Sequence, residues 1–128
     1  MIDQTLAGAR ILVVEDEYYL ADEARQILSH VGADIIGPVP TVAQARAVMD
    51  ANTRIDGALL DVNLRGELVF DLADALQARA IPFAFATGYD GNVLPDRFAE
   101  RPVLNKPVRP EHLIDAFERL ITEARARE

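Results

Sequence analysis

The sequence predicts an α/β fold in which a doubly wound, five-stranded parallel sheet is flanked by helices on both faces. Short apolar runs alternate along the chain with stretches whose apolar residues recur at helical spacing. Repeated alternation of strand and helix is the order that produces a parallel sheet between two helical layers. The strand-like runs are continuously apolar, as expected of strands covered on both faces.

The first half of the chain supplies two strand–helix pairs. Residues 10–15, "RILVVE", predict the first strand, and the helical pattern that follows stops at Gly32, a typical helix terminator. Residues 33–39 predict a second strand, broken by Pro38 and Pro40, and Thr41 is a suitable N-cap for the second helix. The apolar faces expected on these helices are Leu20, Ala24, Ile27, Leu28 and Val31 in the first, and Val42, Ala45 and Met49 in the second.

The second half predicts three strands and two long helices. Strands are expected at residues 56–62, 81–87 and 102–106, a helix at residues 67–79 burying Leu68, Leu72, Ala75 and Leu76, and a last helix opening at Arg109 or Pro110. Glycines and prolines interrupt any long helix between Gly88 and Arg101. We expect one short helix near residues 93–99, or a mobile segment.

Length and composition limit the possible classes of protein. A chain of 128 residues, half of them hydrophobic, suits one domain over residues 1–128, with flexible ends at about 1–8 and 125–128. The net charge of -8 argues against direct binding of nucleic acid, which requires a basic surface. The absence of cysteine excludes disulfides, thiolate metal sites and thiol nucleophiles. No apolar run approaches the roughly 20 residues that cross a bilayer, so we expect a cytoplasmic protein without membrane insertion.

Polar residues end successive predicted strands. The carboxyl ends of parallel strands share one edge of the sheet, and ligands bind there where the strand order reverses. We therefore expect three carboxylates, a hydroxyl and an ammonium group to gather at one rim. The residues concerned are Glu15 and Asp16 after the first strand, Asp61 after the third, Thr87 after the fourth, and Asn105 and Lys106 after the fifth.

This group suits phosphoryl chemistry at a hard cation. Ligands that are all oxygens select Mg²⁺ or Ca²⁺, and a site with few protein ligands and several waters fits Mg²⁺. A lysine and a threonine beside a metal-bound carboxylate suit an incoming phosphoryl group. Asp61 can then act as the nucleophile, since carboxylates form aspartyl-phosphate intermediates, and Thr87 can donate its hydroxyl to a phosphoryl oxygen.

Each of these residues also has an ordinary structural explanation. Glu15 and Asp16 suit a helix N-terminus, Asp61 suits a turn, and Thr87 suits a helix cap. Lys106 before a proline could be a solvated loop lysine. Their expected convergence at one rim favours the chemical interpretation.

The motifs "VVED", "LLDVN", "ATG" and "NKP", in this order and spacing, resemble those of response-regulator receiver domains of two-component systems. The resemblance covers about residues 10–124 and implies a flavodoxin-like fold of the receiver type. The stretch "PFAFATGY" is similar to the receiver subfamily known by the FAT-GUY motif, and "DVNLRGE" resembles that subfamily too.

The resemblance implies a role for each rim residue. Asp61 would accept phosphate from a sensor histidine kinase. Asp16, Asp61 and the backbone carbonyl of Asn63 would bind Mg²⁺ directly, and Glu15 would act through metal-bound water. Lys106 would pair with the phosphoryl group, and the peptide bond after it would be cis.

The switch that follows phosphorylation departs from the common pattern. Many receivers carry an aromatic residue three positions before the lysine, which rotates when the threonine moves. Val103 occupies this position here and cannot serve that purpose. Thr87 therefore remains a switch candidate, with Tyr89 and Phe85 as substitutes for the missing aromatic.

The favoured function is a signalling protein that relays phosphorylation through protein contacts, without an attached output domain and without turnover as an enzyme. Its partners would be a sensor histidine kinase, and a histidine phosphotransfer protein or a downstream target. The alternative is a Mg²⁺-dependent phosphohydrolase, but Asn63 stands where such enzymes carry an acid–base aspartate. A flavodoxin-type FMN module is disfavoured because "EDEYY" is acidic where FMN phosphate would bind.

Overall fold

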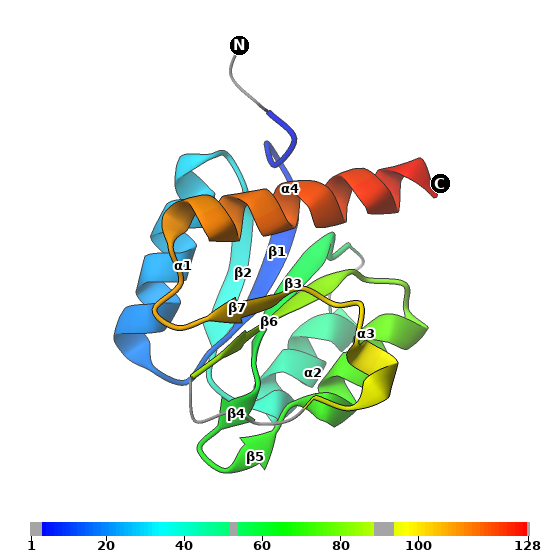
Figure 1. Cartoon of the computed structure of the whole chain (residues 1–128). Coiled ribbons are helices and arrows are strands. Elements are labelled where there is room, and N and C mark those ends of the chain that lie inside the picture. Colours follow the sequence, from blue (N-terminus) through cyan, green and yellow to red (C-terminus); the bar gives the residue numbers. More distant parts are fainter. Residues whose placement is uncertain (1–3, 52–53, 89–93, 128) are drawn as a thin grey trace.

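A computed structural model describes residues 4–51, 54–88 and 94–127. Its central sheet is parallel throughout, with the strand order β2-β1-β3-β6-β7, which confirms the predicted fold class (Figure 1). The strands of this sheet are β1 (Arg10–Val14), β2 (Asp34–Val39), β3 (Gly57–Asp61), β6 (Phe83–Thr87) and β7 (Val103–Asn105).

Helices cover both faces of the sheet. Helices α1 and α4 lie on one face and α2 and α3 on the other (Figure 1). The helices are α1 (Tyr18–His30), α2 (Val42–Ala51), α3 (Phe70–Ala78) and α4 (Pro110–Ala126), with a short 3-10 helix, η1 (Asp96–Phe98), before β7. None of the helices within the described ranges has the length and apolar character that crossing a membrane demands.

Strand β6 illustrates how one apolar run serves two cores. Phe83 and Phe85 point into the core beneath α2, α3 and η1, whereas Ala84 and Ala86 point into the core beneath α1 and α4. Side chains alternate between the two faces of a strand, so a strand buried on both faces shows no polar alternation. The two aromatic rings of β6 thus lie on the η1 side of the sheet.

The predicted stop of the first helix at Gly32 is confirmed. Gly32 has φ 94°, its N–H donates to the Ser29 carbonyl, and the Ala33 N–H donates to the Leu28 carbonyl. Helix α3 ends with the same pair of hydrogen bonds, in which Ala80 and Ile81 are the donors. Here the left-handed position belongs to Ala80, at φ 57°, where glycine is usual.

Ala80→Gly should therefore raise the free energy of unfolding by about 0.5–1 kcal/mol. Relief of the left-handed conformation is worth about 1–2 kcal/mol, and it outweighs the roughly 0.4–1 kcal/mol lost to the greater freedom of glycine in the unfolded chain. Urea denaturation measures the change. Ala78→Gly, inside the last turn of the same helix, is the control and should be destabilising; a loss of stability in both variants would contradict the argument.

The prediction that residues 67–79 form one helix is wrong at its start. Asn63–Leu64 (β4) and Glu67–Leu68 (β5) pair as an antiparallel hairpin, and α3 begins only at Phe70. Leu68, expected to be buried, is 48% exposed. The cause is the two-residue loop between the strands, whose residues both have positive φ and turn the chain back before helical spacing can begin.

One further expectation needs correction. Pro38 does not break the second strand, because β2 continues to Val39 and a register shift against β1 leaves Pro38 out of the paired positions. Proline is tolerated at such irregularities of an edge strand.

The short helix expected near residues 93–99 is confirmed as the single 3-10 turn Asp96–Phe98.

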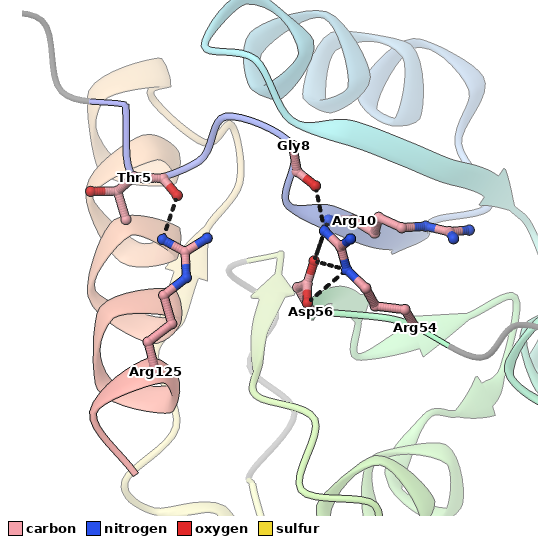
Figure 2. A network of polar contacts seen from close by, with 6 residues as sticks. All are labelled: Thr5, Gly8, Arg10, Arg54, Asp56 and Arg125. Carbon is pink, nitrogen blue, oxygen red and sulfur yellow. Dashed lines mark hydrogen bonds and ion pairs between the residues drawn. The ribbon is translucent and has the colours of Figure 1, made fainter. Parts of the chain in front are cut away.

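Part of the N-terminal end packs against the fold, since Leu6 is buried. At the other end α4 continues to Ala126, where Arg125 and Ala126 are exposed. Two arginines from elsewhere in the chain hydrogen-bond the N-terminal backbone (Figure 2). These bonds join Arg54 Nη2 to the Gly8 carbonyl at 2.7 Å and an Arg125 guanidinium nitrogen to the Thr5 carbonyl at 3.2 Å.

Candidate functional site

The candidate site lies where the strand order reverses. Strand β1 has β2 on one side and β3 on the other, so the chain leaves the sheet in opposite directions from these strands. Glu15 and Asp16 directly follow β1, and Asp61 is the last residue of β3. The structure therefore brings the predicted carboxylates to the edge at which ligands bind in such sheets.

The three carboxylates form one compact cluster. Oxygen atoms of Glu15, Asp16 and Asp61 all lie within 4.8 Å of one another. Glu15 is 8% exposed and Asp61 only 5%, which is rare for carboxylates without a compensating charge. A donor set made of carboxylate oxygens fits a hard divalent cation such as Mg²⁺ or Ca²⁺.

Lys106 directly follows β7, the edge strand of the sheet, and its side chain extends to this cluster. Its Nζ lies 2.7 Å from Glu15 Oε1 and 3.1 Å from Asp61 Oδ2, and its backbone N–H donates to the Thr87 carbonyl. Burial alone would lower the pKa of Lys106, but its bonds to Glu15 and Asp61 raise it above its ordinary value. Lys106 is thus charged and acts as the internal counter-ion of two buried carboxylates. The peptide bond to Pro107 is cis, as the resemblance implied.

Glu15 has an unusual affinity for its proton. Burial, followed by the hydrogen bond and the negative charge of Asp61, raises the pKa of Glu15 from 4.5 to about 7, although Lys106 opposes the shift. Crowded carboxylates resist ionisation together unless a cation lies among them. The site therefore carries more negative charge than its own side chains can neutralise.

Thr87 and Asn63 line the same cleft, whereas Asn105, the last residue of β7, is exposed and is not among its lining residues. Its walls include Asp61, Asn63, Thr87 and Lys106. The Thr87 hydroxyl donates to the Gly88 carbonyl at 3.0 Å, and the Asn63 N–H donates to Asp61 Oδ1 at 3.3 Å. A hydroxyl and a backbone amide thus lie beside the Asp61 carboxylate.

Only one of the two aromatic switch candidates, Phe85, lies within the described residues, and Tyr89 lies outside them. Phe85 is fully buried and packs edge-on against Phe70, Phe83 and Phe98. Val103 is partly exposed on β7.

Sequence reasoning missed one charged residue of the site. Arg65, in the loop of the β4–β5 hairpin, places its Nε 3.3 Å from Asp16 Oδ2. A two-residue loop that ends in glycine, between two short strands, is typical of a tight hairpin. The first loop residue is normally asparagine, aspartate or glycine, so the arginine at this position makes the hairpin hard to predict from the sequence.

Comparison with known proteins connects this geometry to a family. No protein-family model matches the chain, and none of the curated proteins does. Among solved structures it is similar to SdrG from Sphingomonas melonis Fr1, with 42% identity, a TM-score of 0.80, and coverage of 89% of this chain and 97% of that one. The BeF3-activated conformation of SdrG from Pseudomonas melonis Fr1 gives 40% identity, a TM-score of 0.73, and coverage of 90% and 98%.

A more distant similarity shows the fold alone. The CheY-like response regulator receiver domain protein from Methanospirillum hungatei JF-1 shares 23% identity, with a TM-score of 0.81 and coverage of 95% of this chain and 100% of that one.

The acidic edge at the strand reversal and the similarity over nearly the whole length of SdrG lead to one assignment. The chain belongs to the response-regulator receiver domains of two-component signalling.

Proposed function

We propose that this receiver takes a phosphoryl group from a histidine of a sensor histidine kinase onto Asp61, and that Mg²⁺ assists the transfer. The observation that carries the proposal is the environment of Asp61. Its carboxylate is 5% exposed, lies 3.1 Å from Lys106 Nζ, and belongs to a cluster of carboxylates suited to a hard cation. A buried carboxylate beside a cation and a metal-type donor set is suited to nucleophilic attack on phosphorus.

The transfer exchanges one bond to phosphorus for another. An Asp61 carboxylate oxygen attacks phosphorus, the bond from phosphorus to the histidine nitrogen breaks, and the imidazole leaves with the electron pair. Lys106 keeps its positive charge and binds a phosphoryl oxygen, and the Thr87 hydroxyl turns from the Gly88 carbonyl to another phosphoryl oxygen. Asp16, Asp61 and the Asn63 carbonyl would hold Mg²⁺ directly, and Glu15 would act mainly through metal-bound water. The bound Mg²⁺ supplies positive charge to the phosphoryl oxygens.

We further propose that residues 1–128 act as one receiver domain of the FAT-GUY subfamily, in the cytoplasm. Thr87 would report phosphorylation, with Tyr89 and Phe85 as the aromatic switch residues. The signal would pass through contacts with the kinase, a histidine phosphotransfer protein or a target protein. SdrG, 40% identical over 98% of its chain, has a BeF3-activated conformation; this supports the use of BeF3 as an activating mimic here. The Asn63 amide oxygen accepts the Gly66 N–H, and an amide cannot supply the acid–base group that the phosphohydrolase alternative needs.

Incubation with a small phosphodonor and Mg²⁺, followed by intact-mass measurement, tests the proposal. We expect the mass of one phosphoryl group to be added to the wild-type chain and none to Asp61→Asn, because the amide is no nucleophile. Asp71→Asn, on the exposed face of α3, is the matched control and should be labelled like the wild type. Labelling of Asp61→Asn at the wild-type level would place the acceptor elsewhere and contradict the proposal.

A further inference from the structure

Arg65 occupies a backbone conformation that does not favour arginine. It has φ 53° and precedes Gly66, at φ 90°, in the two-residue loop joining β4 to β5. Positive φ at both positions is the requirement of the tight hairpin turn in which asparagine, aspartate or glycine normally comes first. A bulky residue in this region is an outlier that calls for a reason outside the turn itself.

The hairpin aims the Arg65 side chain at the acidic cluster. The Gly66 N–H donates to Asn63 Oδ1 at 2.6 Å, Leu64 is buried in the core, and the Val69 N–H donates to the Val62 carbonyl. The base of the hairpin is therefore anchored, although the Arg65 side chain is itself 83% exposed. Its Nε lies 3.3 Å from Asp16 Oδ2.

The two cationic side chains of the cleft contact different carboxylates. Lys106 contacts Glu15 and Asp61, and Arg65 contacts Asp16. Every carboxylate of the cluster thus has a side-chain cation as its partner. A divalent cation that binds Asp16 therefore shares that carboxylate with the Arg65 guanidinium or displaces it.

We propose that Arg65 is an internal competitor of the divalent cation: it holds the Asp16 carboxylate in the metal-free receiver and gives way when the metal binds. The inference rests on the metal site of the proposed function, and it adds a residue that sets the affinity of that site. Because the pair is exposed, its own strength is modest, and the repulsion between a guanidinium and a nearby divalent ion adds to it. Together these effects correspond to about a 3- to 10-fold weakening of metal affinity.

Titration of the unphosphorylated full chain with Mg²⁺, followed by amide chemical shifts, tests the inference. Arg65→Asn removes the charge and supplies a residue that the turn favours, so the fold should be retained or stabilised. We expect its dissociation constant for Mg²⁺ to fall about 3- to 10-fold below that of the wild type. Urea denaturation in the presence of a chelator checks that the variant is at least as stable as the wild type.

Arg25→Asn is the matched control. Arg25 forms an exposed ion pair with Asp22 on α1, so the substitution changes the net charge of the chain equally without touching the cleft. Its Mg²⁺ affinity should stay within about 2-fold of the wild type, because charges further apart than about 10 Å are screened at ordinary ionic strength. An equal gain in both variants, or no gain in Arg65→Asn, would overturn the role of Arg65.

The failure of this inference can be told from a failure of the proposed function. If the wild type shows no Mg²⁺-dependent shifts around the cleft, the metal site itself is absent and both proposals fall. If the wild type binds Mg²⁺ and is phosphorylated on Asp61, but Arg65→Asn binds Mg²⁺ no more tightly, only the inference about Arg65 is lost.

Discussion

Phe98→Ala is expected to lower the free energy of unfolding by about 3–5 kcal/mol, the usual cost of removing a buried phenylalanine side chain. Phe98 is fully buried although it belongs to a single 3-10 turn. Its ring centroid lies 6.0 Å from that of Phe70, 6.0 Å from Phe83 and 5.5 Å from Phe85. These neighbours come from α3 and β6, which cannot both move inward to fill the space left by the ring.

Phe98 is also the fully buried side chain of the described segment that leads to β7. Two polar contacts of this segment are exposed: Arg97 pairs with Asp74 of α3, and Arg101 donates to Gln77. Exposed ion pairs contribute about 0–1 kcal/mol, so loss of the buried ring should exceed the loss of either contact several-fold.

Equilibrium urea denaturation of three variants measures this ranking. Phe98→Leu keeps most of the apolar volume and should cost less than about 1.5 kcal/mol. Arg97→Ala should cost less than about 1 kcal/mol. If Phe98→Ala proves no more destabilising than Arg97→Ala, the 3-10 turn is held by its polar contacts, and the aromatic cluster is not the anchor.

The convergence of the site could be predicted from the sequence because it depends on few rules. Continuous apolar runs mark strands buried on both faces, and parallel strands bring the residues after each run to one edge. Glu15, Asp16, Asp61 and Lys106 meet in the structure for this reason. The prediction needed only the order of the strands and the polar residues that follow them, and it required no distances.

The β4–β5 hairpin could not be predicted in the same way. Leu68, Leu72 and Leu76 have helical spacing, and this pattern extended the expected helix backwards over Glu67. The turn at Arg65 overrides the pattern through a backbone conformation that propensity argues against. The contact of Arg65 with Asp16 was hidden for the same reason, since it follows from the turn and not from local spacing.

Three carboxylates expected at one rim already imply that one of them resists ionisation; only the structure identifies Glu15 as that residue, and this leads to the second large expected effect. Without metal, the free energy of unfolding should fall by about 1–3 kcal/mol as pH rises from 4.5 to 7.5. The pKa of Glu15 is about 7 in the folded chain and 4.5 for an unperturbed group, so the folded state holds an extra proton in this range. Raising the pH removes that proton from the folded state, and the stability that it conferred is lost. The full difference in pKa is equivalent to about 3.4 kcal/mol, and we expect less because Asp61 and Lys106 readjust.

Urea denaturation with a chelator at several pH values measures the slope, and Glu15→Gln supplies the control. The glutamine cannot ionise, so its stability should be nearly independent of pH in this range and should exceed that of the wild type at pH 7.5. Exposed carboxylates such as Asp22 and Asp74 have lowered pKa values and titrate below the range. The same slope in Glu15→Gln and the wild type would assign the effect to another group.

Mg²⁺ should remove the pH dependence, because the negative charge of Asp61, which adds to burial in raising the pKa of Glu15, also attracts the cation. A divalent ion among the carboxylates favours their ionised forms, so Glu15 would release its proton when the metal binds. The apparent affinity for Mg²⁺ should therefore increase with pH in the wild type until Glu15 is ionised at about pH 7. The affinity of Glu15→Gln should be independent of pH over the same range. Proton and metal thus compete for one buried cluster. The closeness of Glu15 and Asp61 raises the proton affinity of Glu15 in the metal-free protein, and it also favours the binding of a divalent cation.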